Sequence, residues 1–124
     1  MAAAAGAALV LATPAAATGQ GSASSLVITA YNGDDTTWPV IREVTLKCEP
    51  TGGNHEHAED ACASIESVGG NLDELLDRQE LCPEVYQPVT IEVGGNWDDM
   101  VVAFEHTYAN LCFAFSQSDG VFSF

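Results

Sequence analysis

The stretch VTIEVGGNWDDMVVAFEHTY, Val89–Tyr108, contains the clearest β-hairpin signal in the sequence. It holds two runs of apolar, β-branched and aromatic residues, and glycines stand between them. We expect a strand over Val89–Val93, a turn at Gly94–Asn96 and a long returning strand over Trp97–Tyr108. An antiparallel sheet is therefore the expected framework of the fold.

Three further segments have the composition of strands. Ser25–Tyr31, SLVITAY, is apolar and ends at the turn signal Asn32–Asp34. Val40–Cys48 alternates so that its later apolar residues share one face, and Gly120–Phe124 has the composition of a short final strand. The hairpin thus has partners on both sides in the sequence.

A helix is predicted between the second strand and the hairpin. Its apolar residues follow the helical spacing i, i+3, i+4 and i+7, and they are Ala58, Ala61, Cys62 and Ile65. Asn54 is a candidate N-cap, and Gly69 with Gly70 ends the pattern. We expect an amphipathic helix of about three turns.

A short second helix is expected directly afterwards. Asn71 and Glu74 have the spacing of a capping box ahead of Leu72, Leu75 and Leu76. The element order is then strands, helices, a loop and strands, and no internal repeat interrupts it. This order predicts an α+β domain with the helices on one side of an antiparallel sheet.

Composition excludes several functions. The chain has 124 residues, enough for one domain, and it carries 3 Lys plus Arg against 18 Asp plus Glu, a net charge of −15. Nucleic-acid and anionic-membrane partners are excluded, because both require clustered basic side chains. Disorder is excluded too, since 47% of the residues are hydrophobic and the mean hydropathy is +0.09.

The first residues have the pattern of a secretory signal peptide. No charged residue precedes Asp34, and an apolar stretch over Ala7–Ala12 is followed by the small residues Ala15–Ala17. We expect a signal peptide over 1–17, a flexible segment over 18–24, a folded domain over 25–124 and a secreted, extracellular protein. The opening Lys or Arg of such a peptide is missing, so a truncated leader and a flexible Ala-rich tail are the alternatives.

Four cysteines stand at 48, 62, 82 and 112, and they permit three pairings. No Cys-x-x-Cys occurs, which disfavours a thioredoxin-type or zinc-ribbon site. An exported chain would pair its cysteines. If neighbours in the sequence pair, the chain-entropy estimate gives stabilisations of roughly 3 and 4 kcal/mol.

No catalytic, cofactor-binding or metal motif is complete. A G-x-S-x-G elbow, a phosphate loop and a dinucleotide turn are all missing, and His55, His57 and His106 have no identifiable nucleophile beside them. The segment from His55 resembles H-E-x-x-H, but Glu59 stands where the second His is needed. His55 and His57 with Glu59 or Asp60 form a weak metal-site alternative to a solvated, acidic helix start. We predict no enzyme, no cofactor and no metal.

The segment Leu81–Pro88, LCPEVYQP, restricts its own backbone. Each proline fixes its own φ and pushes the preceding residue to extended geometry, while Val85 is β-branched and stiff. The pairs concerned are Cys82 with Pro83, and Gln87 with Pro88. The result is a short, extended, exposed loop, which suits the cleft of a protease because proteases bind extended strands. An ordinary disulfide-tethered connection is the alternative.

The chain resembles the Streptomyces subtilisin inhibitor family from about Ser25 to Phe124, and most closely over Cys82–Val89. The other matching pieces are Val44–Leu46 before Cys48-x-Pro50, Ala61–Ala63, Gly95-x-Trp97, Phe104 to Cys112, and Val121–Phe124. The four-cysteine framework and the order of the pieces make this a specific resemblance.

The resemblance implies a fold and an activity. The fold is α+β, a five-stranded antiparallel sheet with two helices on one side, in a homodimer whose disulfides are Cys48–Cys62 and Cys82–Cys112. The activity is inhibition of extracellular serine proteases of the subtilisin class by the standard substrate-like mechanism.

The resemblance also assigns the reactive site. The bond to be cleaved falls between Glu84 and Val85, with Glu84 as the P1 residue and Asn110 supporting the loop from behind. The remaining loop residues are Cys82, Pro83, Tyr86, Gln87 and Pro88.

This sequence departs from the family at P1, where members commonly carry Met, Lys or Arg. Glu84 directs the expected preference toward a Glu-specific protease, a glutamyl endopeptidase. The alternative function is a secreted acidic surface protein or cross-linking substrate without inhibitory activity. Its candidate cross-linking groups are Lys47, Gln79, Gln87 and Gln117.

Overall fold

The computed structural model describes residues 23–77 and 81–123. The predicted signal peptide over 1–17, most of the 18–24 segment and Gln79 lie outside these residues. The elements are β2 (Ser24–Tyr31), β3 (Val40–Cys48), β4 (Gly52–Gly53), α1 (Ala58–Ser67), the 3₁₀ helix η1 (Leu72–Asp77), β5 (Val89–Trp97), β6 (Met100–Tyr108) and α2 (Leu111–Gln117).

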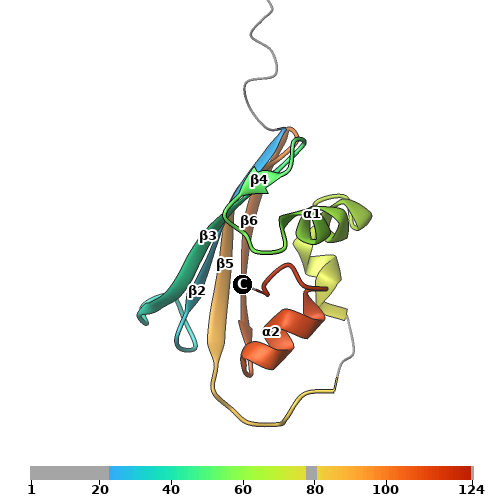
Figure 1. Ribbon diagram of the computed structural model, residues 1–124. Coiled ribbons are helices and arrows are strands. Elements are labelled where there is room, and N and C mark those ends of the chain that lie inside the picture. Colours follow the sequence, from blue (N-terminus) through green and yellow to red (C-terminus); the bar gives the residue numbers. More distant parts are fainter. Residues whose placement is uncertain (1–22, 78–80, 124) are drawn as a thin grey trace, which may run out of the picture.

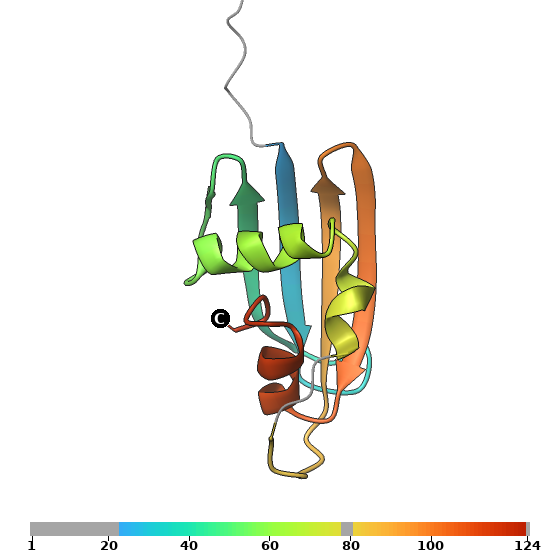
Figure 2. The same cartoon turned by 90° about the vertical axis from the view of Figure 1, so that its right-hand side faces the viewer.

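One five-stranded antiparallel sheet, in the order β4-β3-β2-β5-β6, forms the framework of the described residues. The helices α1 and α2 and the 3₁₀ helix η1 all lie against the same face of it (Figures 1 and 2). The predicted α+β fold, with a five-stranded sheet and helices on one side, is confirmed.

The core lies between the sheet and the helices. It is built from the alternate strand residues that point to the helical side, together with the inner faces of the helices. The largest apolar side chains that are fully buried are Leu26, Ile28, Val44, Leu46, Ile65, Val89, Ile91, Val93, Val121 and Phe122. Burial of these side chains, together with Ala114 of α2, packs the helices against the sheet.

The hairpin is correct, but its turn is not where the glycines predicted it. β5 continues through Gly94–Asn96 to Trp97, and the chain reverses at Asp98, whose φ is +51°. A Cβ at Gly95, where φ is +138°, would stand 2.1 Å from the carbonyl oxygen of Ser25 on β2. The glycine therefore permits close strand approach rather than a turn.

The chain end differs most from the prediction. No strand forms over Gly120–Phe124 in the described part; a helix, α2, precedes a run of turns there. Val121 and Phe122 are buried, so their apolar character fills the core rather than extending the sheet. Asp119 and Gly120 both have positive φ, which is incompatible with a strand.

The two residues predicted to cap helices, Asn54 and Asn71, both make side-chain hydrogen bonds. The predicted N-cap Asn54 is wrong: α1 starts after His57, and the Asn54 side chain accepts a hydrogen bond from Thr45 N–H at 2.7 Å. At η1 the Asn71 side chain does cap the first turn, since its Oδ1 accepts from Asp73 N–H at 3.2 Å, but the predicted reciprocal box does not form: Glu74 N–H donates to the Asn71 carbonyl, and Asn71 Nδ2 donates to Glu74 Oε2 at 3.1 Å. The helix it starts is 3₁₀.

The folded domain begins one residue earlier than predicted. Ser24 opens β2 and is buried, and its Oγ accepts a hydrogen bond from Asp98 N–H at 2.9 Å. It therefore belongs to the sheet and not to the flexible segment predicted over 18–24. None of the helices in the described ranges is long and apolar enough to cross a membrane.

Tyr108→Phe is expected to leave the domain at least as stable at pH 8, with a gain of up to about 1 kcal/mol. The Tyr108 hydroxyl is buried and has no hydrogen-bond partner among the described residues. Burial, with a smaller effect of the Asp73 charge, raises the pKa of Tyr108 above its ordinary value of 10.0. Because the folded state disfavours the charged phenolate, this group leaves the free energy of unfolding unchanged below pH 10 and lowers it as the pH rises from 10 through the folded pKa.

Urea unfolding at pH 8 and at pH 10.5 measures both effects, with the exposed Tyr86→Phe as the matched control. The alkaline loss of stability should be smaller in Tyr108→Phe than in wild type. A loss of more than 1 kcal/mol at pH 8 would show that the hydroxyl has a stabilising partner.

Candidate reactive-site loop

Residues 81–88 form an exposed, extended loop between η1 and β5 at one end of the sheet (Figure 1). Leu81 is fully exposed, Tyr86 is 71% exposed and Val85 is 51% exposed. Large apolar side chains are rarely left this open without a partner. The loop therefore leaves its side chains open to solvent instead of packing them against the core of the domain.

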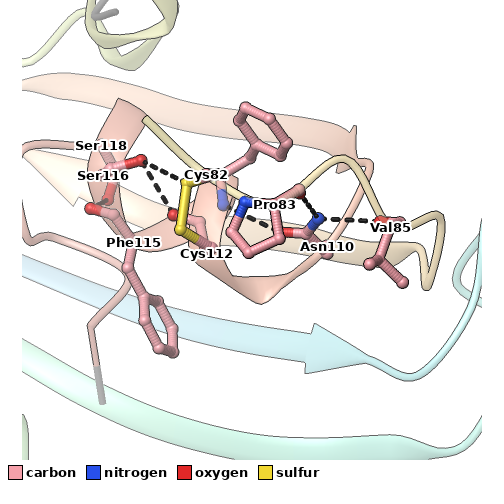
Figure 3. The surroundings of a disulfide bond; sticks show 9 residues. Cys82, Pro83, Val85, Asn110, Cys112, Phe115, Ser116 and Ser118 are labelled. Atoms are coloured by element: carbon pink, nitrogen blue, oxygen red, sulfur yellow. Dashed lines mark hydrogen bonds between the residues drawn. A yellow bond between two sulfur atoms is a disulfide. The ribbon is translucent and has the colours of Figure 1, made fainter. Parts of the chain in front are cut away.

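A disulfide anchors the first end of the loop. Cys82 is bonded to Cys112, the second residue of α2, and their Cα atoms are 5.8 Å apart (Figure 3). The other disulfide, Cys48–Cys62, joins β3 to α1. The sequential pairing is confirmed, and only one of the two bridges touches the loop.

The sheet anchors the second end. Gln87 N–H donates to the carbonyl of Ala109 at 2.8 Å, which extends the pairing of β5 with β6 beyond the Val89–Tyr108 pair. The loop is thus held at Cys82 by a covalent bond and at Gln87 by a backbone hydrogen bond, with four residues between them.

The Asn110 side chain lies behind these four residues. Its Nδ2 donates to the carbonyl oxygens of Pro83, at 3.0 Å, and Val85, at 2.8 Å (Figure 3). These carbonyls belong to the residues before and after Glu84. A single amide group therefore fixes the Pro83–Glu84 and Val85–Tyr86 peptide groups, which flank the predicted reactive bond Glu84–Val85.

The same side chain begins α2. Asn110 Oδ1 accepts from Phe113 N–H at 3.2 Å, and the residue itself has extended backbone geometry, as an N-cap requires. Both polar groups of the amide are used, and exchanging its oxygen and nitrogen would break all three bonds. Asn110 thus ties the loop to the helix that carries Cys112.

The Glu84 side chain is exposed and makes no hydrogen bond or ion pair with the described residues. The ion pair found between described residues, Arg42 with Glu56 at 3.3 Å, has both side chains about half exposed. The carboxylate at the loop tip is therefore available to a partner.

In the predicted metal-site alternative, the ring of His55 makes hydrogen bonds within the protein instead. His55 is buried, its Nε2 donates to the Val121 carbonyl at 2.6 Å, and its Nδ1 accepts from His57 N–H at 2.9 Å. Both ring nitrogens thus join the start of α1 to the chain end. No group of three His, Cys, Asp or Glu side chains suited to a metal ion occurs in the residues that the structure describes.

Sequence reasoning missed three groups at the loop. The N–H of Phe113 and the hydroxyl of Ser116, which lies 3.5 Å from Cys82 Sγ, belong to α2, which was not predicted. The carbonyl of Ala109 lies just beyond the end of β6. A signal was present, since Asn110 is a favoured N-cap residue ahead of an apolar run. The run was too short to be recognised by its periodicity.

Residues 22–110 match the model of the subtilisin inhibitor-like family. A probable subtilase-type protease inhibitor from Streptomyces avermitilis is 43% identical over 118 residues, 92% of this chain and 82% of that protein. Trypsin inhibitor STI2 from Streptomyces longisporus is 40% identical over the same shares.

A solved structure also matches the fold. It is that of Streptomyces caespitosus sermetstatin in complex with Bacillus licheniformis subtilisin, with a TM-score of 0.69 and 30% identity. The match covers 82% of this chain and 98% of the sermetstatin chain. Sequence and fold agree, and this chain belongs to the subtilisin inhibitor-like family.

Proposed function

We propose that this protein is a secreted inhibitor of serine endopeptidases and not an enzyme, and that its reactive bond is Glu84–Val85. The observation that carries the proposal is the pair of hydrogen bonds from Asn110 to the carbonyls of Pro83 and Val85. They fix the backbone around Glu84 in an exposed loop, which lowers the entropy lost when a protease binds it.

The anchors also account for resistance to cleavage. When the serine hydroxyl of a protease attacks the Glu84 carbonyl carbon, the Glu84–Val85 bond breaks, and an acyl-enzyme and the amine of Val85 form. The acyl side stays attached through Cys82–Cys112, and the amine side stays attached through Gln87 and β5. The amine is thus held near the acyl group, and the peptide bond re-forms faster than the ends separate.

The charge of Glu84 supports a preference for proteases whose S1 pocket accepts a carboxylate. A carboxylate entering an apolar S1 pocket loses its hydration at a cost of several kcal/mol. A pocket with cationic or N–H donors instead forms charge-assisted hydrogen bonds with it. The proposed cognate enzyme is therefore a glutamyl endopeptidase. Related proteins are named for different targets, a subtilase-type protease and trypsin, so the framework itself is compatible with several.

The proposal includes a homodimer. The sheet face opposite the helices is not covered by any described element (Figure 1), and Val27 is 42% exposed on it. Glu43, Glu92 and Glu105 lie in one cross-strand row of that face, through the pairs that each strand makes. A symmetric contact there has to keep the two rows of carboxylates apart or hydrated, because like charges directly opposite are destabilising.

Secretion is part of the same proposal. Both disulfides suit an oxidising compartment, and an extracellular inhibitor meets its proteases there. Titration of subtilisin, trypsin and a glutamyl endopeptidase with the protein is the test. An inhibitor abolishes the activity of at least one enzyme near a one-to-one ratio. A non-inhibitory surface protein or cross-linking substrate leaves all three enzymes active, and that result would refute the proposal.

Substitutions of Asn110 distinguish its support of the loop from its contribution to the stability of the fold. Asn110→Asp keeps an oxygen that caps α2 but loses both donors to the loop, and its charge faces the carbonyls of Pro83 and Val85. We expect a melting temperature close to that of wild type and cleavage of the loop by the target about tenfold faster, the scale of one to two lost hydrogen bonds.

Mass spectrometry of the cleaved inhibitor over time gives the rate, with Asn110→Ala as the companion variant that loses cap and support together. Asn110→Ala should melt lower than Asn110→Asp and should also be cleaved faster than wild type. If Asn110→Asp is cleaved at the wild-type rate, the loop geometry does not depend on this side chain.

A further inference from the structure

The hairpin between β2 and β3 lies at the same end of the sheet as the reactive loop (Figures 1 and 2). A cavity of about 470 Å³ lies between this hairpin and the end of the loop. We call it the primed-side groove, and its principal walls are Trp38, Ile41, Pro88 and Leu111. Neither Trp38 nor Ile41 has a role in the function proposed above.

Three large apolar side chains of the groove are exposed. Trp38 is 51% exposed, Ile41 46% and Leu111 41%. These residues come from the hairpin and from the start of α2, which are distant in sequence. Contiguous exposed apolar surface of this kind marks interaction sites, and tryptophan is enriched among the residues that dominate binding energy.

A β-bulge brings Ile41 to this surface. Arg42 pairs with Ala30 and Val40 pairs with Tyr31, so Ile41 is an extra residue without a partner on β2. A bulge re-aims the side chain that it carries, and bulges are frequent beside functional sites. In a regular strand Ile41, and not Val40, would pair with Tyr31 and would lie on the Tyr31 face of the sheet.

The hairpin holds Trp38 in place before any partner arrives. The indole lies against Gly33, where an added Cβ would stand 2.0 Å from its Cγ, and its Nε1 donates to Asp34 Oδ1 at 3.0 Å. The carbonyl of Gly33 in turn accepts from Thr90 Oγ1 on β5 at 2.9 Å. Asp34 O accepts from Thr107 Oγ1 on β6 at 3.3 Å. A surface fixed in this way loses little entropy on binding.

The position of the groove relative to the proposed reactive bond indicates which partner would contact it. Gln87 and Pro88, which line it, follow Val85 on the leaving-group side of the proposed reactive bond. A standard protease–inhibitor interface takes about 20–30 residues from each partner. The loop over 81–88 supplies eight residues, so flanking elements have to supply the rest. The groove is the apolar surface that continues the loop on this side.

We propose that the primed-side groove is a second contact surface for the same protease, and that it receives an apolar side chain from the rim of the enzyme cleft beyond the leaving-group subsites. This inference rests on the proposed function and deepens it. Asp34 lies in the lining and Asp35 follows it, while no Lys or Arg lines the groove. The occupant is therefore apolar with a basic neighbour, and an acidic rim is disfavoured.

Inhibition constants of Trp38→Ala and Ile41→Ala against the inhibited protease test the proposal. Val101→Ala is the matched control, because Val101 is 86% exposed but pairs with Asn96 at the opposite end of the sheet. We expect Trp38→Ala to bind about 30-fold more weakly, mainly through faster dissociation, while still titrating the enzyme one to one. Ile41→Ala should weaken binding in the same direction, and the control should stay within about twofold of wild type.

A second measurement does not depend on the folding of Trp38→Ala. Wild-type protein labelled with 5-fluorotryptophan gives ¹⁹F signals from Trp38, half exposed, and Trp97, buried, and Trp38→Phe assigns them. In the one-to-one complex the ¹⁹F chemical shift of Trp38 should change, and it should no longer differ between H₂O and D₂O. The chemical shift of Trp97 should be the same in the free protein and in the complex.

An unchanged Trp38 signal in a stoichiometric complex, or equal inhibition by Trp38→Ala, would overturn the second contact surface and leave the inhibitor function intact. If wild type inhibits no serine protease, the proposed function fails and the groove proposal fails with it.

Discussion

Replacing Cys82 and Cys112 with serine is expected to turn lasting inhibition into temporary inhibition. This disulfide is the covalent link between the acyl side of the reactive bond and α2. Without it, the chain ahead of Glu84 can move away once the bond is cut, and the two ends no longer meet at high effective concentration. The variant should still bind the protease at first, and the activity should then return as the inhibitor is consumed.

The second disulfide supplies the control. Cys48→Ser with Cys62→Ser removes a bridge across 14 positions, compared with 30 for the loop bridge. The chain-entropy estimates of roughly 3 and 4 kcal/mol are similar, so both variants lose comparable stability. Only the loop variant should show recovery of protease activity, measured over hours below both melting temperatures. Equal, lasting inhibition by both variants would mean that packing alone keeps the cut ends together.

Glu84→Met is expected to reverse the preference between proteases. The Glu84 side chain contacts no partner among the described residues, so its replacement changes recognition without disturbing the fold. Met fills an apolar S1 pocket without the desolvation cost of a carboxylate. Subtilisin inhibition should strengthen by about 10- to 200-fold, the range for one apolar side chain in its pocket, and glutamyl endopeptidase inhibition should weaken.

Glu84→Gln separates charge from shape, because it keeps the length of the side chain and removes its charge. Inhibition constants for wild type and both variants against both enzymes, at one ionic strength, give the comparison. Gln should lose most of the affinity for the glutamyl endopeptidase and gain little for subtilisin. If wild type already inhibits subtilisin as tightly as Glu84→Met does, then position 84 does not set the specificity.

The strands were predictable where local signals and packing agree. Val40–Cys48 was predicted with its observed bounds, because its apolar residues alternate and Pro50 with Gly52 ends the run. The errors occur where a residue serves a distant contact. Gly95 has the local signature of a turn but permits β2 to approach, and Val121 has that of a strand but packs in the core. Neither requirement can be read from neighbouring residues.

In the candidate site, too, some features follow from local sequence and others depend on distant contacts. The rigidity of residues 82–88 follows from Pro83, Val85 and Pro88 themselves, so the sequence alone suggests an extended loop. The roles given to Asn110 and to the pairing of Cys82 came from a family resemblance, since no local rule joins positions 83 and 110. The groove beside Trp38 was not predicted, because only the order of the strands brings residue 38 near residue 88.

Ser24 and the reactive loop lie at opposite ends of the sheet. Ser24 lies beside Asp98 at the turn between β5 and β6, and the reactive loop enters β5 at the other end, at Val89. Nine strand residues lie between these ends, about 30 Å at the usual rise of a strand. A solid support, cell envelope or fusion partner joined ahead of Ser24 therefore leaves the inhibitory tip pointing away from it (Figure 2). The fold is suited to tethering, and an immobilised copy would capture proteases from the surrounding solution.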